Sequence, residues 1–167
     1  KAYNSANIYN CKTNGIITGI GSGGIVGSNM GENTTGNNRL SYCYTTGNIS
    51  GASSGGITGA NAGKNSKSLT IDKCYTIGNV LGSRGGGLLG NFGGTDCSNL
   101  LIENCYTIGY LDASFGGSGI GFNLGQGQGS YCAIENFYSR GDLSGSESFG
   151  ITGINNNFSY PTNKPSM

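Results

Sequence analysis

The chain of 167 residues contains 34 glycines, two prolines, no histidine and no tryptophan, and nine basic and eight acidic side chains give a net charge of +1. The glycines follow no three-residue period, which excludes collagen, and the charge is too low for a charge-driven disordered chain. No run approaches the roughly 18 apolar residues of a membrane span. The basic cluster typical of nucleic-acid binding is missing, and so is histidine, the commonest general base and metal ligand. We therefore expect neither a membrane span nor a nucleic-acid partner.

The sequence is an array of repeats of 31 or 32 residues. Each repeat has an apolar position, then a cysteine or phenylalanine three residues later, which we call the anchor, and then a glycine-rich stretch. The apolar positions are Ile8, Leu40, Ile71, Ile102 and Ile134. The anchors are Cys11, Cys43, Cys74, Cys105 and Phe137. The glycine-rich stretches end at Gly27, Gly59, Gly90, Gly121 and Gly153. Because all three recur with one step, the repeats are structurally equivalent units.

Residue parity within each repeat separates an inner from an outer face, because alternate side chains of a strand point to opposite sides. Steps of two from an anchor give small or apolar residues such as Cys43, Thr45 and Ile49, which we expect to face inward. The intervening residues, such as Tyr44 and Asn48, are more polar and are expected to face outward. The 3.6-residue apolar period of a helix is missing.

These features predict an all-β fold, a three-sided parallel β-solenoid (β-helix) of about five coils with 31–32 residues per coil. Each coil is expected to hold three short strands, one of them in the glycine-rich stretch. The pattern leaves the hand of the winding open. Residues 1–157 are expected to form one solenoid repeat domain, followed by a C-terminal tail at 158–167. The position two residues after each glycine-rich stretch is expected to lie at a corner and is mostly asparagine. Its side chains form either a ladder of hydrogen-bonded amides or a simple turn. Its residues are Asn29, Asn61, Phe92, Asn123 and Asn155.

Two recurring stretches carry a family resemblance. Asn-Cys-Tyr-Thr-Ile-Gly-Tyr-Leu at 104–111 and Gly-Gly-Ile-Thr-Gly at 55–59 resemble the GLUG-motif repeats of bacterial and giant-virus surface proteins. The resemblance covers about residues 6–157. It implies an adhesin stalk or surface fibre rather than any one enzyme. Lys12 replaces the tyrosine in the first copy and Phe137 the cysteine in the last, as is common in terminal repeats.

The six cysteines allow buried thiols, disulfides or metal binding. Four form one inward column: Cys11, Cys43, Cys74 and Cys105. A straight column lacks the converging geometry of a zinc site, so we expect no metal and a core cysteine ladder. Neighbours in the column are close enough for an occasional bridge, such as Cys43 to Cys74. Cys97 and Cys132 lie outside the column, in what we take as equivalent connecting regions of adjacent coils, and a disulfide between them would indicate an oxidising compartment.

Three carboxylates lie two residues before an anchor and are expected to form a surface column: Asp72, Glu103 and Glu135. Carboxylates about 4.8 Å apart repel, which favours a calcium ion, a cation such as Lys73, or a plain solvated corner. Parallel β-helix polysaccharide lyases and hydrolases also place carboxylates on a sheet face. Because this chain lacks their long insertions, we expect no enzyme, no catalytic residue and no cofactor beyond the calcium alternative.

Aromatic and apolar residues are expected to form an outer column: Tyr44, Tyr75, Tyr106, Tyr138, Ile77 and Ile108. Tyrosines in register stack on sugar rings or pack against another protein. The apolar neighbours favour a lateral protein interface, and glycan binding stays the alternative. Three sequons supply candidate N-glycosylation sites at Asn33, Asn48 and Asn157.

The ends of the solenoid suggest its function. A parallel solenoid exposes unpaired backbone groups on its first and last coils, and natural ones usually cap them. No amphipathic cap precedes the first repeat or follows the last, and the chain begins at Lys1 without a methionine or signal peptide, which predicts a processed chain or a piece of a longer one. We expect a structural module of an extracellular, cell-surface or virion-surface fibre, assembling by end-to-end coil stacking as a homopolymer or longer repeat array. An adhesin segment that binds cell-surface glycans is the first alternative, and a small polysaccharide lyase or hydrolase the second.

Overall fold

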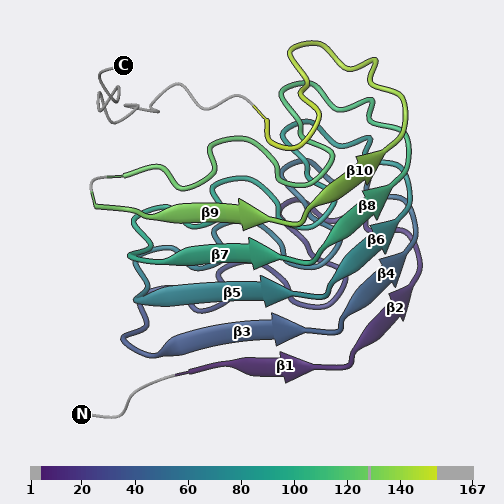
Figure 1. The fold of residues 1–167 in the computed structure, drawn as a ribbon. Helices are drawn as coiled ribbons and strands as arrows, with labels where there is room; N and C mark the ends of the chain where they lie inside the picture. The colour runs from purple at the N-terminus through teal and green to yellow at the C-terminus, as the bar shows by residue number, and fades with distance from the viewer. Residues whose placement is uncertain (1–4, 128, 154–167) are drawn as a thin grey trace, which may run out of the picture.

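The computed structural model of the chain describes residues 5–127 and 129–153 and has two parallel five-stranded sheets (Figure 1). The first sheet contains β1 (Asn7–Tyr9), β3 (Asn37–Ser41), β5 (Ser68–Asp72), β7 (Leu100–Glu103) and β9 (Cys132–Glu135). The second contains β2 (Lys12–Asn14), β4 (Tyr44–Thr46), β6 (Tyr75–Ile77), β8 (Tyr106–Ile108) and β10 (Tyr138–Arg140). Among these residues no helix could cross a membrane. The expected tail at 158–167 and Asn155 lie outside the described residues.

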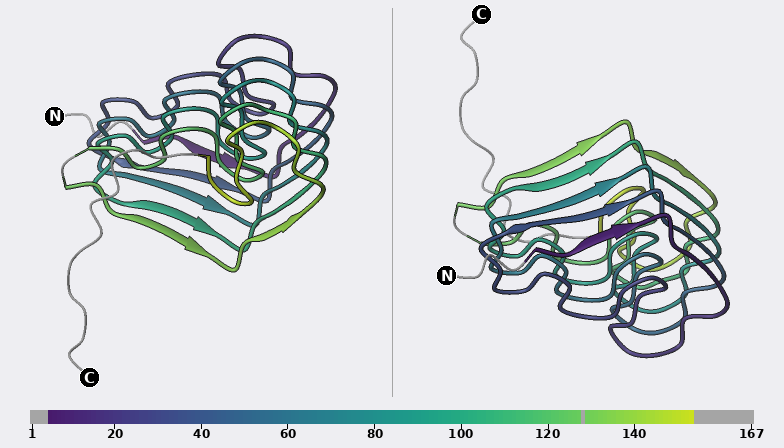
Figure 2. Two further views of the ribbon diagram at one scale, coloured as in Figure 1. Left: turned by 90° about the horizontal axis from the view of Figure 1, so that it is seen from above. Right: turned by 90° about the horizontal axis from the view of Figure 1, so that it is seen from below.

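The strands stack as a parallel β-solenoid, which confirms the expected fold class. The chain completes about four turns, close to the expected five coils. Odd-numbered strands form one wall, even-numbered strands form the next, and connecting segments close the remaining side (Figure 2). The path from β1 up to β10 winds in a right-handed sense (Figures 1 and 2).

The repeat spacing sets the strand register. Tyr75 of β6 pairs with Tyr44 of β4 on one side and with Tyr106 of β8 on the other. Ile71 pairs in the same way with Leu40 and Ile102. Equivalent residues of adjacent turns therefore lie directly above one another, as the constant step of 31 or 32 residues predicts.

The glycine-rich stretch is less regular than the strand expected from its sequence. It is held by isolated parallel bridges, such as Gly55 to Gly86 and Thr58 to Leu89, with bends between them. Glycine has no side chain to favour extended backbone, so the segment bends between its bridges. The third side of the solenoid is thus a bridged wall rather than a sheet.

The inner face has the residues that parity predicts. Cys43, Thr45 and Ile49 are fully buried, whereas Tyr44 and Asn48 are half-buried. The cores of successive turns join into two clusters, one that includes Cys43 and a smaller one that includes Ile49. Burial of these apolar side chains supplies the main stabilising force.

Inward threonines connect the second sheet to the bridged wall across the core. The Thr45 hydroxyl donates a hydrogen bond to the Gly56 carbonyl oxygen at 2.6 Å, and Thr76 donates to Gly87 at 2.7 Å. Because a buried hydroxyl without a partner destabilises the fold, these bonds explain why threonine is tolerated inside. The sequence signal for them is the fixed offset of 11 residues between each threonine and its glycine.

The corner between the two sheets requires left-handed backbone. Its residue has a φ between 49° and 57° in every turn. The residues are Asn10, Tyr42, Lys73, Asn104 and Asn136. Asparagine adopts this conformation readily, but tyrosine and lysine do not. The sequence pattern did not reveal this corner, because tyrosine and lysine occupy it in two turns.

The asparagine corner combines both interpretations left open by the sequence. Asn29, Asn61, Phe92 and Asn123 all have positive φ, as a turn requires. The Asn61 amide also donates to the Asn29 side-chain oxygen at 3.2 Å, as a ladder requires. Phe92 has no side-chain amide, so the ladder of side-chain amides is interrupted at that turn.

Glycines after the second-sheet strands allow the turns to approach closely. A Cβ added at Gly78 would collide with the Gly47 carbonyl oxygen, and one added at Gly47 would collide with that of Gly15. Neither position has positive φ, so close backbone approach alone excludes a side chain there.

We expect Gly78→Ala to lower the free energy of unfolding by about 1–3 kcal/mol, because the added methyl forces two turns apart. Urea denaturation followed by circular dichroism measures this change. Gly27→Ala is the matched control, since a Cβ there meets nothing within 4 Å. Equal stability of the two variants would contradict the close approach.

Candidate functional site

The cysteine column is buried and hydrogen-bonded. Cys43, Cys74 and Cys105 are buried, and Cys11 at the open end is partly buried. Each thiol donates to the carbonyl oxygen two residues earlier, as from Cys43 to Ser41 at 3.3 Å. The left-handed corner residue between them turns that carbonyl toward the thiol. The buried column agrees with the expected core ladder, and its thiols add a second hydrogen bond to corner carbonyls, such as that of Ser41, that already accept a backbone N–H from the preceding turn.

All six cysteines are free thiols, including Cys97 and Cys132. The expectation that these two occupy equivalent places was wrong, because Cys132 pairs with Leu100 in the first sheet. Cys97 instead lies against the Ser66 hydroxyl, at 3.4 Å. Both side chains contribute to the core cluster.

Burial sets the acidity of these thiols. Burial raises the pKa of Cys43 to about 11 and that of Cys132 to about 12. The hydrogen bond to Cys105 and burial raise the pKa of Cys74. These thiols stay protonated at neutral pH, so they are poor nucleophiles.

Stability should therefore fall at alkaline pH. The folded pKa of Cys43 exceeds the ordinary value of 9.0, so its contribution to stability is complete below about pH 9 and is lost as the pH rises through 11. We expect the free energy of unfolding of Cys43→Ser, which keeps a small donor, to fall less steeply than that of the native chain between pH 9 and 11. Urea titrations at each pH measure this, and identical slopes would contradict it.

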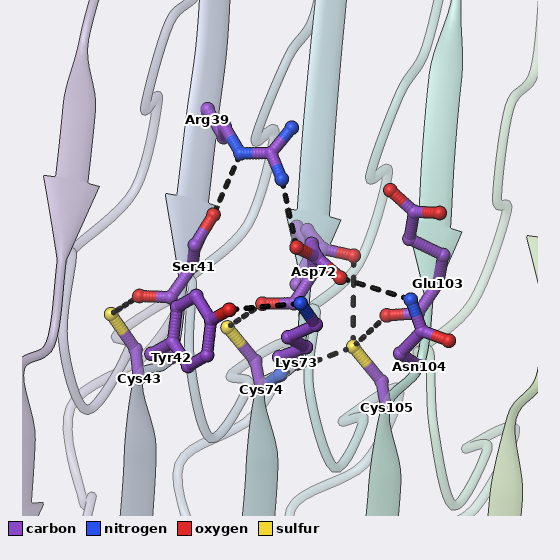
Figure 3. Close-up of polar contacts among 11 residues, drawn as sticks. Arg39, Ser41, Tyr42, Cys43, Asp72, Lys73, Cys74, Glu103, Asn104 and Cys105 are labelled. Atoms are coloured by element: carbon purple, nitrogen blue, oxygen red, sulfur yellow. Dashed lines mark hydrogen bonds and ion pairs between the residues drawn. The ribbon is translucent and has the colours of Figure 1, made fainter.

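The acidic column is aligned as expected, but its first member is buried. Asp72 pairs with Glu103, and Glu103 with Glu135. The Asp72 side chain is only 5% exposed and accepts a hydrogen bond from the Arg39 guanidinium at 2.7 Å (Figure 3). The Asn104 amide donates to its other oxygen at 3.1 Å. Asp72 is thus not part of a solvated surface column.

The cation beside Asp72 is Arg39 rather than Lys73, which corrects the sequence-based expectation. The Lys73 ammonium donates to the Tyr42 hydroxyl at 2.8 Å and lies over its ring. Half-buried Glu103 and exposed Glu135 complete the column. Within the described residues, no group of three or more acidic, cysteine or histidine side chains could hold a metal ion.

The Arg39–Asp72 pair should contribute to stability. We expect Asp72→Asn to lower the free energy of unfolding by about 1–2 kcal/mol, because Arg39 loses its charged partner at a buried position. Glu135→Gln, at the exposed end of the same column, should change it by less than about 0.5 kcal/mol. Thermal and urea denaturation compare the two, and an equal loss for both variants would contradict the role of burial.

Three members of the tyrosine column, Tyr44, Tyr75 and Tyr106, form a ring stack. The ring centroids of Tyr44 and Tyr75 are 4.7 Å apart, and those of Tyr75 and Tyr106 are 4.6 Å apart. The planes differ by 3° and 5°. Burial, with the neighbouring Tyr106 and Tyr44, raises the pKa of Tyr75. Tyr138 continues the register in the last turn and is 55% exposed.

This stacking limits what the column can bind. A sugar packs on the face of an aromatic ring, and both faces of Tyr75 are covered by Tyr44 and Tyr106. The adjacent Ile77 and Ile108 remain exposed beside the stack. Around Tyr75 the outer face therefore presents a ring edge and neighbouring apolar side chains.

Two of the three sequons lie in the described residues. Asn33 is exposed, and its side-chain oxygen accepts a hydrogen bond from the Asn65 amide at 3.1 Å. Asn48 is half-buried, and its oxygen accepts from the Asn79 backbone N–H at 3.0 Å. Asn157 lies outside the described residues. Asn33 is thus the more accessible acceptor of the two.

Both ends of the described solenoid leave strand edges unpaired. The edge strands are β1 and β2 at one end and β9 and β10 at the other (Figure 1). Unpaired parallel edges present regularly spaced backbone donors and acceptors, a template for another strand.

The hydrophobic core also reaches the surface at the last turn. Leu143 is 49% exposed, whereas Leu111, its equivalent one turn below, is 1% exposed. Ile151 is 41% exposed, although Ile57 in the same column is fully buried. A hollow of about 400 Å³ opens at this end, and its lining includes Phe137, Leu143 and Ile151. Phe137, Leu143 and Ile151 continue the inward columns of the repeats into the last one, but the repeat pattern did not indicate that they are at least partly exposed there.

No family model, curated protein or solved structure matches the chain.

Proposed function

We propose that the protein is a structural module that assembles end to end into a fibre by stacking solenoid turns. The observation behind this proposal is the open last turn, where edge strands β9 and β10 coincide with exposed core residues. Covering Leu143 and Ile151 by another turn removes apolar surface from water and pairs the free backbone groups.

The other surfaces support this function better than the alternatives. The ring stack covers both faces of Tyr75, the central tyrosine of the column, so a glycan could not pack on that ring. A lyase or hydrolase built on this column would lack Asp72 as a free carboxylate, because Arg39 holds it, and would retain only Glu103 and Glu135. The exposed Ile77 and Ile108 leave the tyrosine face available for side-by-side packing of fibres.

The same proposal includes an extracellular, cell-surface or virion-surface location. Its support is the resemblance to surface-protein repeats and the exposed candidate N-glycosylation site at Asn33. Four of the six free thiols are buried, where oxidants reach them slowly, and Cys11 and Cys132 are partly buried.

We expect the purified chain to form species longer than one module as its concentration rises, in sedimentation velocity and electron microscopy. Leu143→Lys should suppress this association, because it places a charge in the apolar junction. The half-exposed position tolerates lysine in the monomer, which circular dichroism verifies.

Leu81→Lys is the matched control, since Leu81 is 39% exposed on a lateral face away from both ends. It should leave the length of the assemblies unchanged. A chain that stays monomeric at every concentration would refute the proposed function. Association blocked by Leu81→Lys and not by Leu143→Lys would place the contact on the lateral face instead.

A further inference from the structure

We infer that the partner at the open ends is a second copy of this chain, stacked head to tail in the same register as turns within one copy. This inference rests on the proposed function and specifies its contact. Strand β2 of one copy then pairs in parallel with β10 of the copy below it. The register places Lys12 of the upper copy directly on Tyr138 of the lower copy.

The inward columns continue across such a junction. One step beyond the last turn, Ile17 follows Leu143, and Ile25 follows Ile151. Within the chain, the first column already joins Ile17 to Ile49 and Leu111 to Leu143 by parallel bridges. In the second column, the Ile25 N–H donates to the Ile57 carbonyl oxygen and the Gly119 N–H to that of Ile151. The upper copy would thus place apolar side chains over the hollow at the last turn.

Polar positions also match. Thr13 of the upper copy follows Ser139, so a hydroxyl meets a hydroxyl in the position of the inward threonines. Asn10 follows Asn136 at the left-handed corner. The Asn136 amide already donates to the Asn104 side-chain oxygen at 3.2 Å, and an amide from Asn10 can donate to Asn136 in the same direction. No polar side chain is forced onto an apolar one at these two positions.

The proposed contact between Lys12 and Tyr138 has a counterpart inside the molecule. Lys73 lies over the ring of Tyr42 from the preceding turn, with its ammonium 4.9 Å from the ring centroid. Its ammonium also donates to the Tyr42 hydroxyl. The order is the same at the junction, with tyrosine in the lower turn and lysine in the turn above.

A two-fold arrangement of the last turns fits less well. It would pair the edge strands of the two copies antiparallel and place Tyr138 of one copy near Tyr138 of the other. The columns of inward residues would then not continue from one copy into the next. Head-to-tail stacking keeps every strand parallel and leaves an open edge at each end for further copies. It therefore extends without closing, as a fibre requires.

The test uses a charge swap on the full chain. Within one copy, positions 12 and 138 are four turns apart, about 19 Å, so direct contact between them arises only between copies. Tyr138→Lys should weaken association about tenfold, because it replaces a cation–π contact by two facing ammonium groups. Lys12→Glu should weaken it about threefold. The double variant should return to near the native association constant, because glutamate then faces lysine.

Sedimentation equilibrium measures the association constants, and circular dichroism verifies that each variant is folded. Lys64→Glu combined with Tyr138→Lys is the control, since Lys64 lies beside Glu32 and away from the proposed contact. It should give no rescue.

If the native chain associates but Lys12→Glu fails to restore Tyr138→Lys, the register is wrong while end-to-end assembly stands. If Tyr138→Lys alone has no effect on association, the head-to-tail contact is also refuted. If the native chain remains monomeric, both this inference and the proposed function fail.

Discussion

Parallel backbone hydrogen bonding between equivalent residues of adjacent turns determines the rest of this structure. Because each turn repeats after 31 or 32 residues, every side chain lies above its equivalent in the turn below. A residue type that fits one turn must then tolerate its own copy about 4.8 Å away. Small thiols, stacked rings and hydrogen-bonded amides meet this condition, whereas side chains of like charge repel one another. The one column of carboxylates is accordingly relieved by Arg39, which holds Asp72.

Much of the fold could be predicted from the sequence, because the repeat period and residue parity are local signals. They identified the inward cysteines and threonines, the outward tyrosines and the strand register. The glycine-rich stretch was expected to be a strand, but it is held only by isolated bridges. A glycine-rich segment held by such bridges has the same sequence pattern as a strand. The left-handed corner was hidden because Tyr42 and Lys73 occupy it, and neither residue type indicates positive φ.

The candidate sites were harder to predict, because they depend on contacts between turns that are not in register. Arg39 reaches Asp72 diagonally, 33 residues further along the chain. That contact buries a carboxylate expected on the surface and leaves Lys73 to bind Tyr42. The closeness of the tyrosine rings followed from the register, but their parallel stacking, which covers the ring faces, depends on side-chain rotation that parity does not fix.

The same bonding that holds the turns together also leaves strand edges unpaired at both ends of the described solenoid. The core is shared between turns, and Leu143 and Ile151 show it exposed at the last described turn. The most direct test of this account is a cryo-electron-microscopy reconstruction of assemblies formed at high concentration. The account predicts one continuous solenoid, in which the spacing across each junction equals the roughly 4.8 Å between turns inside a copy. Copies joined only by their sides, or separated by a gap at the junction, would contradict it.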